Sequence, residues 1–502
     1  MPSSSSSASS KLPLEVSAAV IERGGRILLA LRKDKEGRPL GWEFPGGKRK
    51  PGETFSACAI REIKEELNAD IIPTGIVYDK TTNIRLVGVS AKLKGSEPVP
   101  LEHAKLAWVK REDLAKYALL PNDIPLAKAL AEQISLPRTA PPQKLALYIH
   151  VPFCLRKCRY CAFYSHPPQN NEIQEYAEAL IHQIRTLLPL MPYRELSSVY
   201  FGGGTPSLLP GDALLRVCEA VKEAIRWPDD IECTLEANPA AFKSEDLDFW
   251  KTAGVNRISL GVQSLQNNEL QYLGRLHNAE EAKEAYQTLR KNGFKNISLD
   301  LMYGLPHQTI SSWQKSVIEL LSWQPEHISF YALSVEKGTP LQKENPTLPS
   351  DATTMKEYWL ARKLLKEKGY EMYEISNAAK PNYYSRHNST YWDTEKHYLG
   401  LGPGAHSYCR FPYRNIARRA HMDQAWKLIT AKPLNKIQKL GERIYLGLRK
   451  SEGVKLTPQD EELFQKQIED LSDRKLVTCK GSTLKLTRRG VELANIVMAE
   501  FV

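Results

Sequence analysis

Three cysteines stand close together near residue 160 of the chain. Cys154, Cys158 and Cys161 have the spacing C-x3-C-x2-C and follow an apolar run at 145–151 that is typical of a buried strand. Thiolate clusters of this kind hold iron–sulfur centres, and a cubane of four irons takes four ligands. Three cysteines would therefore leave one iron open to a small molecule.

Two other interpretations of these cysteines are open. A closed structural zinc site also takes four ligands, and the fourth could be His150 or His166, although neither has zinc-finger spacing and the chain holds no second C-x2-C pair. Buried free cysteines behave as small apolar residues, which suits the basic residues between them badly: Arg156, Lys157 and Arg159. Ligand number and spacing favour the iron–sulfur cluster.

The motif Tyr148-x-His-x-Pro-Phe-Cys154, with the aromatic Tyr160 before the last cysteine, resembles the radical S-adenosylmethionine (SAM) enzymes. In that family the open iron chelates the amino and carboxylate groups of SAM, and reductive cleavage yields a 5′-deoxyadenosyl radical. The resemblance implies a 4Fe–4S cluster, SAM and an electron donor such as flavodoxin or ferredoxin. It points to the branch that contains oxygen-independent coproporphyrinogen III oxidase and the HemW heme chaperones.

Length and composition limit the remaining possibilities. A chain of 502 residues predicts two to four domains, and its 42% hydrophobic and 25% charged residues are ordinary for a soluble protein. No apolar run approaches the roughly 20 residues that span a bilayer, and the serine-rich residues 1–12 read as a disordered tail without a signal peptide's apolar centre. The other five cysteines lie far apart, as in a reducing cytoplasm. The net charge of +11 shows no basic-aromatic stripe, so no nucleic-acid partner is expected.

A second group of chemically active residues lies on a predicted helix over 54–67. Glu62, Glu65 and Glu66 share one face of that helix, and Glu53 stands just before it. Carboxylates in this number suit Mg²⁺ or Mn²⁺ holding a polyphosphate. Three glutamates alone would equally fit a solvated acidic face.

The string from Gly47 onward resembles the Nudix box, G-x5-E-x7-R-E-U-x-E-E-x-G-U. The matching residues are Gly47, Glu53, Arg61, Glu62, Ile63, Glu65 and Glu66. Asn68 stands where the family has glycine; the position closes a helix and needs a left-handed backbone, which Asn tolerates best after Gly. The resemblance implies that Glu62, Glu65 and Glu66 bind metal and that Arg61 orients a carboxylate.

The lead-in Gly41-Trp-Glu-Phe-Pro-Gly-Gly is similar to the Nudix branch that hydrolyses oxidised nucleotides such as 8-oxo-dGTP. That resemblance implies a diphosphatase acting on nucleoside triphosphates, with Glu102 as an additional acid or base and Asn122 as a purine-reading amide. We assign this domain, a Nudix α/β/α sandwich, to residues 13–135. The proline-rich segment 136–144 reads as a linker.

From residue 145 to 345 the chain alternates strand-like and helix-like patterns. Six strand-like runs occur, at 145–151, 198–203, 231–237, 257–263, 296–303 and 327–333, with amphipathic stretches between them. Repeated strand–helix units predict a parallel sheet with helices outside, here a partial (β/α) barrel, whose active site lies at the strands' C-terminal ends. The overall fold class is therefore α/β.

Polar or glycine residues stand at successive ends of these strands. By resemblance to the radical SAM family the SAM-contacting residues are Tyr148, Tyr160, Gly203, Gly204, Thr205, Glu236, Gln263, Arg275 and Asp300. A single polar residue at a strand end can simply cap the next helix. Several at successive strand ends, with the cysteine loop on the first strand, favour one pocket.

The C-terminal third distinguishes the two related functions. The oxidase has a further cysteine two residues after the last cluster cysteine, and this chain has Phe163 there. The segment Arg386–Trp392 resembles the His-Asn-x-x-Tyr-Trp motif of HemW-type proteins, so His387 is the expected heme-binding residue, with His406 as a weaker second candidate. Imidazole is a good ligand for heme iron, although a lone core or surface histidine is the usual alternative. We assign 346–430 to a heme-associated segment and 431–502 to a small helical, winged-helix-like cap.

These features together predict a fusion of a Nudix hydrolase with a HemW-like protein that binds heme in the cytoplasm and delivers it to acceptor proteins. The alternative is an enzyme that decarboxylates coproporphyrinogen III to protoporphyrinogen IX. A third hypothesis gives nucleotide hydrolysis the main role and makes the C-terminal part accessory.

Overall fold

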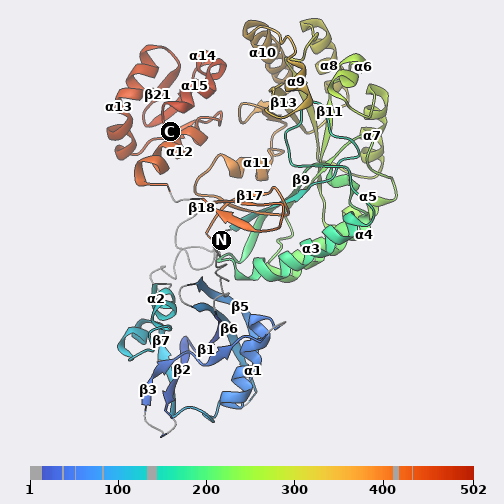
Figure 1. Cartoon of the computed structure of the whole chain (residues 1–502). Helices are drawn as coiled ribbons and strands as arrows, with labels where there is room; N and C mark the ends of the chain where they lie inside the picture. Colours follow the sequence, from blue (N-terminus) through green and yellow to red (C-terminus); the bar gives the residue numbers. More distant parts are fainter. Residues whose placement is uncertain are drawn as a thin grey trace, which may run out of the picture. The chain divides into compact units, whose positions relative to one another are not determined.

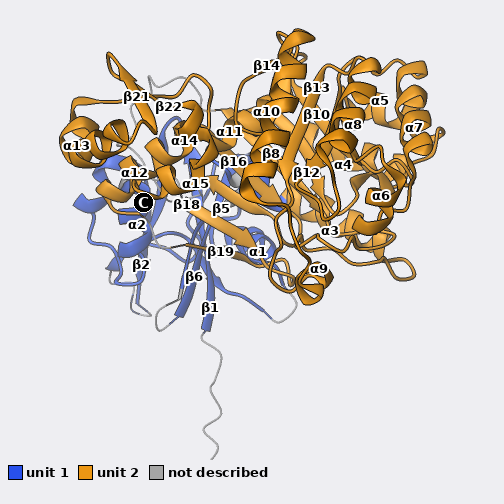
Figure 2. Cartoon of the chain, turned by 90° about the horizontal axis from the view of Figure 1, so that it is seen from above, with its two compact units in different colours: residues 1–141, 186–192, 410–417 blue, residues 142–185, 193–409, 418–502 orange. Residues whose placement is uncertain are grey.

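The computed structural model describes residues 14–502 except 35, 37–38, 51–52, 82–83, 96, 133–143, 411–417 and 432–433. The predicted tail, and the predicted linker up to residue 143, lie outside the described residues. The chain forms two compact units, coloured separately in Figure 2. Unit 1 consists of residues 1–141, 186–192 and 410–417, and unit 2 of all the others.

Unit 1 is built on a mixed sheet. Its strands are β1 (Leu14–Arg23), β2 (Arg26–Lys33), β3 (Pro39–Glu43), β4 (Gly46–Lys48), β5 (Asp70–Thr81), β6 (Ile84–Lys94) and β7 (Lys105–Lys110). The main path runs β3-β2-β1-β6-β5, with β4 on β1 and β7 on β2. Its helices are α1 (Phe55–Leu67), the short 3-10 helix at Arg111–Lys116 and α2 (Ile124–Glu132).

The sheet of unit 1 has an apolar core on each face. Alternate residues of β1 point to opposite faces: Val20 packs in the core that contains Leu126 of α2, and Ile21 in the core that contains Ile63 of α1. Helix α1 begins after Thr54, whose side chain accepts a hydrogen bond from the amide of Ala57. The result is the expected α/β/α sandwich (Figure 1).

Unit 2 is organised around six parallel strands in chain order. They are β8 (Lys144–Val151), β9 (Glu195–Gly203), β10 (Glu232–Ala237), β11 (Arg257–Gln263), β12 (Ile297–Tyr303) and β13 (His327–Ala332), at the positions of the six predicted runs. The helices between them are α3 (Glu172–Leu187), α4 (Gly211–Ala224), α5 (Asp246–Ala253), α6 (Asn267–Leu273), α7 (Ala279–Lys291) and α8 (Ile310–Ser322). Figure 1 shows these helices along the outside of the curved sheet.

Further strands extend this sheet at both edges. Beyond β13 lie β15 (Asn377–Ala379) and β14 (Glu371–Met372); beyond β8 lie β16 (His397–Leu401), β17 (His406–Cys409), β18 (Arg418–Met422) and β19 (Leu428–Thr430). The sheet is open, because β14 and β19 end its hydrogen-bonded path. Three more helices belong to this region: α9 (Pro340–Glu344), α10 (Asp351–Glu367) and α11 (Arg386–Tyr391).

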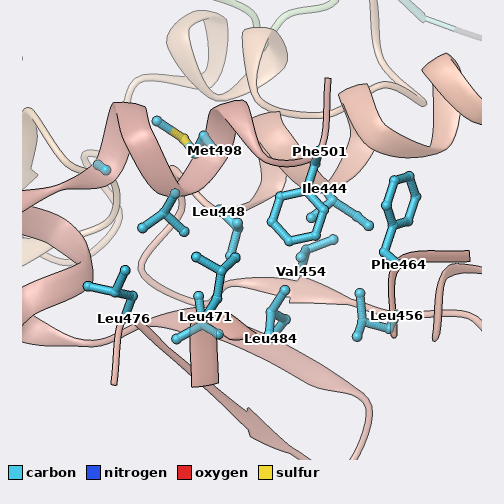
Figure 3. Close-up of a cluster of buried hydrophobic side chains, with 13 residues drawn as sticks. Ile444, Leu448, Val454, Leu456, Phe464, Leu471, Leu476, Leu484, Met498 and Phe501 are labelled. Atoms are coloured by element: carbon cyan, nitrogen blue, oxygen red, sulfur yellow. The ribbon is translucent and has the colours of Figure 1, made fainter. Parts of the chain in front are cut away.

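The C-terminal part of unit 2 combines helices with a three-stranded sheet, in the order β20-β22-β21. Its elements are α12 (Lys436–Gly447), β20 (Val454–Lys455), α13 (Pro458–Asp473), β21 (Val477–Lys480), β22 (Thr483–Leu486), α14 (Arg488–Glu492) and α15 (Ala494–Ala499). Figure 3 shows the side chains that close its core, among them Leu448, Phe464 and Phe501. No helix in the described part of the chain is long and apolar enough to cross a membrane.

Candidate functional site

A cavity of about 680 Å³ lies at the C-terminal ends of the parallel strands of unit 2. Its wall includes all three clustered cysteines and eight of the nine residues predicted to contact SAM, namely Tyr160, Gly203, Gly204, Thr205, Glu236, Gln263, Arg275 and Asp300. The ninth, Tyr148, is not among the lining residues and stacks on Tyr200, with ring centroids 6.1 Å apart. The strand ends therefore bring residues from across the sheet into one chamber.

The cysteine loop is fixed to the strands around it. Thr205 Oγ1 lies 3.5 Å from Cys154 Sγ, and Arg275 Nη1 lies 3.4 Å from Cys158 Sγ. Arg156 donates to the carbonyls of Gly274 and Arg275, at 2.9 Å each. The loop is thus positioned by hydrogen bonds independently of any bound group.

The three thiols fit a cluster better than a single ion. Among the residues that the structure describes, no three metal-binding side chains converge on one ion position. A closed zinc site needs such convergence, whereas the cysteines of a cubane each bind a different iron. Burial raises the pKa of Cys161, and the charges of the other two cysteines raise it further. Without a metal the Cys161 thiol therefore keeps its proton, whereas a bound metal centre would favour the thiolate.

Glycines let the backbone of the second strand approach the cysteine loop. A Cβ on Gly204 would lie 2.5 Å from the carbonyl oxygen of Phe153, and Gly203 has a φ of +111°. The amide of Gly204 also donates to the carbonyl of Val151 at 2.8 Å. No larger residue fits at Gly204 unless the cysteine loop moves.

Glu236 is a half-buried carboxyl on the cavity wall and is held from two sides. The hydroxyl of Tyr200 donates to Oε1 at 2.7 Å, and the amide of Gly203 donates to Oε2 at 3.2 Å. Burial, opposed by these hydrogen bonds, raises the pKa of Glu236 to about 7. The pKa of Asp300 is also raised by burial. Both groups can change protonation state when a ligand enters the cavity.

His387 lies inside the fold. Its side chain is buried, its Nδ1 is 2.9 Å from the Ser198 hydroxyl, and its Nε2 is 3.0 Å from the Tyr391 hydroxyl. Burial, and next the positive charge of Arg257, lower the pKa of His387 to about 3. Both ring nitrogens of His387 have partners in this structure, so a bond between His387 and heme iron requires this packing to open.

Glu232 on β10 explains why His387 lies inside the fold. Its carboxylate accepts hydrogen bonds from the amides of Arg386 and His387, both at 3.0 Å. A carboxylate at a helix start offsets the helix dipole, so α11 is held against the strands and His387 points into the sheet's interior.

The sequence reasoning missed the buried cation Arg257. Its side chain is 1% exposed, and its Nε and Nη1 have no hydrogen-bond partner among the described residues. The residue begins β11, on the same face as Ser259, which lines the cavity. The signal was present at every second position, where polar residues or glycine stand in place of apolar ones: Arg257, Ser259, Gly261 and Gln263.

In unit 1, helix α1 gathers the glutamates around Arg61. The guanidinium lies 2.9 Å from Glu53, 2.6 Å from Glu62 and 3.2 Å from Glu65. The hydrogen bond from Arg61 lowers the pKa of Glu53 to about 2. The oxygen donors suit Mg²⁺ or Mn²⁺. In this structure two of the three expected metal ligands, Glu62 and Glu65, form ion pairs with Arg61 instead.

Glu66, the third expected ligand, has different surroundings. It accepts a hydrogen bond from the amide of Gly46 at 3.0 Å, and burial raises its pKa to about 7. A Cβ on Gly47 would lie 2.4 Å from the carboxylate carbon of Glu62, so any larger residue there displaces the end of the Glu62 side chain. Asn68 ends the helix with φ 46°, in the left-handed region that the sequence predicted.

Glu102 and Asn122 lie exposed on loops, each beside a buried residue. His103 places its Nε2 3.1 Å from Glu43, and Asp123 accepts a hydrogen bond from the amide of Phe44 at 3.1 Å. The loops are thus anchored to the segment that precedes α1, and the two predicted side chains are free to meet a ligand.

Comparisons with known proteins agree with the two units. The family model of the radical SAM superfamily matches residues 148–320, and that of the NUDIX domain matches residues 11–132. The chain is 38% identical to the heme chaperone HemW of Haemophilus influenzae over 279 residues, which is 55% of this chain and 73% of that protein. It is 34% identical to the heme chaperone HemW of Lactococcus lactis, over 71% of this chain and 96% of that protein.

Among solved structures, the coproporphyrinogen III oxidase HemN of Escherichia coli superimposes with a TM-score of 0.63 at 20% identity. The match covers 72% of this chain and 91% of that chain. At this identity the likeness shows a shared fold.

Proposed function

The chain belongs to the HemW family of radical SAM proteins and carries a NUDIX domain before the radical SAM region. From this membership we propose that unit 2 binds heme and delivers it to acceptor proteins. We also propose that unit 1 hydrolyses nucleotides. Membership of the radical SAM superfamily implies a 4Fe–4S cluster and SAM, and the NUDIX domain implies a hydrolase that uses a divalent metal.

One observation carries the proposal for unit 2: the cavity that unites the cysteine loop with the polar strand ends. Cys154, Cys158 and Cys161 would hold the cluster, which supplies one-electron chemistry when bound. Glycine backbone at 203–204 and the carboxyls of Glu236 and Asp300 would bind and orient the polar parts of SAM. Arg275, beside Cys158, would offset the negative charge of a thiolate ligand.

A carrier is favoured over an oxidase by the residue at position 163. The ring of Phe163 is 67% exposed and lines the cavity next to the cysteines. In the oxidase branch a further cysteine stands there, and Phe163 supplies neither a thiol nor a metal ligand. The similar proteins named heme chaperones support the same choice.

The function of unit 2 is tested by anaerobic reconstitution of the full chain with iron and sulfide, followed by heme titration and by incubation with coproporphyrinogen III, SAM and a reductant. We expect bound heme and its transfer to an apo-acceptor, and no protoporphyrinogen IX. The triple variant Cys154→Ala, Cys158→Ala, Cys161→Ala should lose the cluster, whereas Cys479→Ser, at an exposed cysteine on β21, should keep it. Turnover of coproporphyrinogen would contradict the carrier function.

For unit 1 we propose a metal-dependent diphosphatase that acts on oxidised purine nucleotides of the 8-oxo-dGTP type. The arrangement of Glu53, Arg61 and Glu62 supports metal and phosphate chemistry, and the exposed amide of Asn122 supports base recognition. The acid or base assigned to Glu102 is available on its exposed loop.

This activity is tested by incubating the full chain with Mg²⁺ and a panel of normal and oxidised nucleoside triphosphates. We expect pyrophosphate release to be fastest with an oxidised purine and to be lost in the double variant Glu65→Gln, Glu66→Gln. Glu97→Gln is the matched control, because Glu97 is an exposed glutamate of the same unit that pairs with Arg23 instead. Hydrolysis that is unchanged in the double variant would rule out the assigned site.

A further inference from the structure

Arg257 is a buried cation for which the surrounding strands provide no direct partner. Its Nε and Nη1 atoms are shielded from solvent and have no hydrogen-bond partner, and the described residues form no ion pair with it. Burying an unpaired charge is costly. The charge of Arg257 must therefore be stabilised by groups that it does not touch.

Another arginine of unit 2 shows what a structural role requires. Arg290 on α7 donates to the Tyr286 hydroxyl at 2.8 Å and to the Phe294 carbonyl at 3.1 Å, and it pairs with Glu326 at 2.6 Å. These bonds tie α7 to the residues that precede β12 and β13. Arg257 ties no elements together in this way, so its charge is what distinguishes it from an apolar residue of similar length.

Carboxyl groups stand on both strands beside β11. On β10, Glu236 is the Cα partner of Ser259, which follows Arg257 on the same face of its strand. On the other side, the hydroxyl of Ser259 donates to Asp300 of β12 at 3.3 Å. Glu236 and Asp300 both line the cavity. Arg257 therefore starts the strand that separates the two carboxyl-bearing strands of the cavity wall.

The charge of Arg257 acts on both carboxyls. Burial raises the pKa of Glu236 to about 7 and also raises that of Asp300, and the charge of Arg257 opposes burial in both cases. Charges enclosed by protein are screened less than charges at the surface. An arginine without a direct contact can therefore still favour the carboxylate forms, and its removal should raise both pKa values further.

The other titratable groups around Arg257 do not take over this role. Burial shifts the pKa of four of them so that each is neutral near pH 7: His327, His387, Tyr200 and Tyr373. Glu232 on β10 uses both carboxylate oxygens to accept the amides of Arg386 and His387. Glu236 and Asp300 are therefore the groups through which Arg257 can act on the cavity.

We propose that Arg257 is a positioning residue for the ligand of this cavity: its buried positive charge stabilises the anionic forms of Glu236 and Asp300, which accept hydrogen bonds from the ligand. A carboxylate offers acceptor sites only, whereas a protonated carboxyl uses one oxygen as a donor. The effect on the ligand rests on the proposed binding of SAM in unit 2. The action of Arg257 on the two carboxyls does not.

The action on the carboxyls is tested without a ligand. Urea unfolding of the full chain between pH 4 and 9 measures the stability difference between wild type and Glu236→Gln, and then the same difference with Arg257→Met in both chains. With Arg257 the difference should level off just above pH 7. With methionine it should go on changing for about one further pH unit, because the folded pKa of Glu236 is higher. Arg257→Gln serves as the neutral variant if Arg257→Met does not fold.

The effect on the ligand is tested by calorimetry of SAM binding between pH 6 and 9, on the anaerobic chain with its cluster reconstituted. Wild-type affinity should rise as the pH passes through about 7. Arg257→Met should bind at least about tenfold more weakly at pH 7 and approach wild-type affinity at pH 9. Arg257→Lys keeps the charge and should follow the wild-type profile. The titration of SAM itself is common to all variants.

Arg290→Met is the control for loss of a structural arginine. It should lower stability, since three contacts are lost, and leave the pH profile of SAM binding unchanged. An unchanged pH range in the Glu236 comparison would overturn the role of Arg257, and so would an equal loss of SAM affinity at every pH. A wild-type chain that binds no SAM at any pH would instead reject the proposed function of the cavity, and the unfolding comparison would still decide on Arg257.

Discussion

The two candidate sites each contain a carboxyl whose pKa is shifted, and the shifts of Glu53 and Glu236 have opposite signs. In unit 1, Arg61, whose side chain is 21% exposed, pairs with Glu53 and Glu62, and the pKa of Glu53 falls to about 2. In unit 2, Glu236 is half-buried and has no ion pair among the described residues, and its pKa rises to about 7, as that of Glu66 does in unit 1. A carboxyl paired with an arginine stays charged and ready for a cation, whereas an unpaired carboxyl shielded from water stays close to neutral until a ligand arrives.

The difference follows from how each site is assembled. The residues of unit 1 come mainly from one helix and the turn before it, from Gly47 to Glu66. Those of unit 2 come from the cysteine loop after β8 and from five strands, β9 to β13, spread over more than a hundred residues. Substitutions should therefore affect chemistry without much loss of stability in unit 1, and both together in unit 2.

The largest effect is expected at His387. His387→Ala removes two buried hydrogen bonds and the stacking on Tyr200, 5.0 Å away, and should destabilise unit 2 by about 3–4 kcal/mol. Asn122→Ala on the exposed loop of unit 1 should change stability by less than about 0.5 kcal/mol. Calorimetry of both variants measures this contrast.

Heme binding of the same His387→Ala variant sharpens the result. We expect the folded variant to lose the Soret absorption of bound heme, because the resemblance to HemW-type proteins assigns the heme contact to His387, and the packing around α11 would then open on binding. Unchanged heme affinity in the folded variant would remove His387 from the site.

The second prediction concerns pH: the stability that Glu236 and Glu53 each contribute should change with pH in opposite directions. The folded pKa of Glu236 lies above its usual value of 4.5, so its contribution to stability is present below pH 4.5 and is lost as the pH rises towards about 7. Relative to Glu236→Gln, the wild type should lose up to about 3 kcal/mol over this range. The folded pKa of Glu53 is lowered, so its stabilising effect is present above pH 4.5 and is lost as the pH falls towards about 2.

Urea unfolding of Glu236→Gln and Glu53→Gln between pH 3 and 8 measures these trends. The difference from wild type should change mainly between pH 4.5 and 7 for Glu236→Gln and only in the acid range for Glu53→Gln. The same sign for both variants would refute the contrast between buried and ion-paired carboxyls.

How far the sequence predicted these sites depends on whether their residues are local in the chain, as in unit 1, or come from distant strands, as in unit 2. The Nudix string is local, so its helix and its glutamate face followed from spacing, and its left-handed end at Asn68 followed from the resemblance to the Nudix box. The strand pattern of unit 2 predicted that polar strand ends meet, because parallel strands end at one edge; the resemblance to the radical SAM family named the residues, and eight of those nine line the cavity. Burial inside the sheet was not predictable in this way: whether His387 is open depends on Glu232, 155 residues earlier in the chain, and Arg257 is buried by elements from the whole unit.

The third prediction compares two glycines that lie close to a site. Gly204→Ala places a Cβ 2.5 Å from the backbone oxygen of Phe153, which cannot move alone, so it should destabilise unit 2 by about 1–3 kcal/mol and impair cluster retention. Gly47→Ala meets the end of the Glu62 side chain, which can rotate away. It should lower nucleotide hydrolysis while stability changes by less than about 1 kcal/mol. Calorimetry, iron content and pyrophosphate release measure the two outcomes; equal destabilisation would contradict the distinction between backbone and side-chain contacts.

The smallest effect is expected at Asn68, an exposed residue with a strained backbone at the end of helix α1. Asn68 has φ 46°, and its amide donates to the carbonyl of Ile63. Glycine adopts this conformation without the steric strain of a Cβ, so Asn68→Gly should stabilise unit 1 by less than about 1 kcal/mol, and Asn68→Ala should destabilise it by a similar amount. Since α1 carries the glutamates, nucleotide hydrolysis should follow these changes only weakly. If both variants lowered stability equally, the asparagine side chain, and not the backbone conformation, would be what the helix end requires.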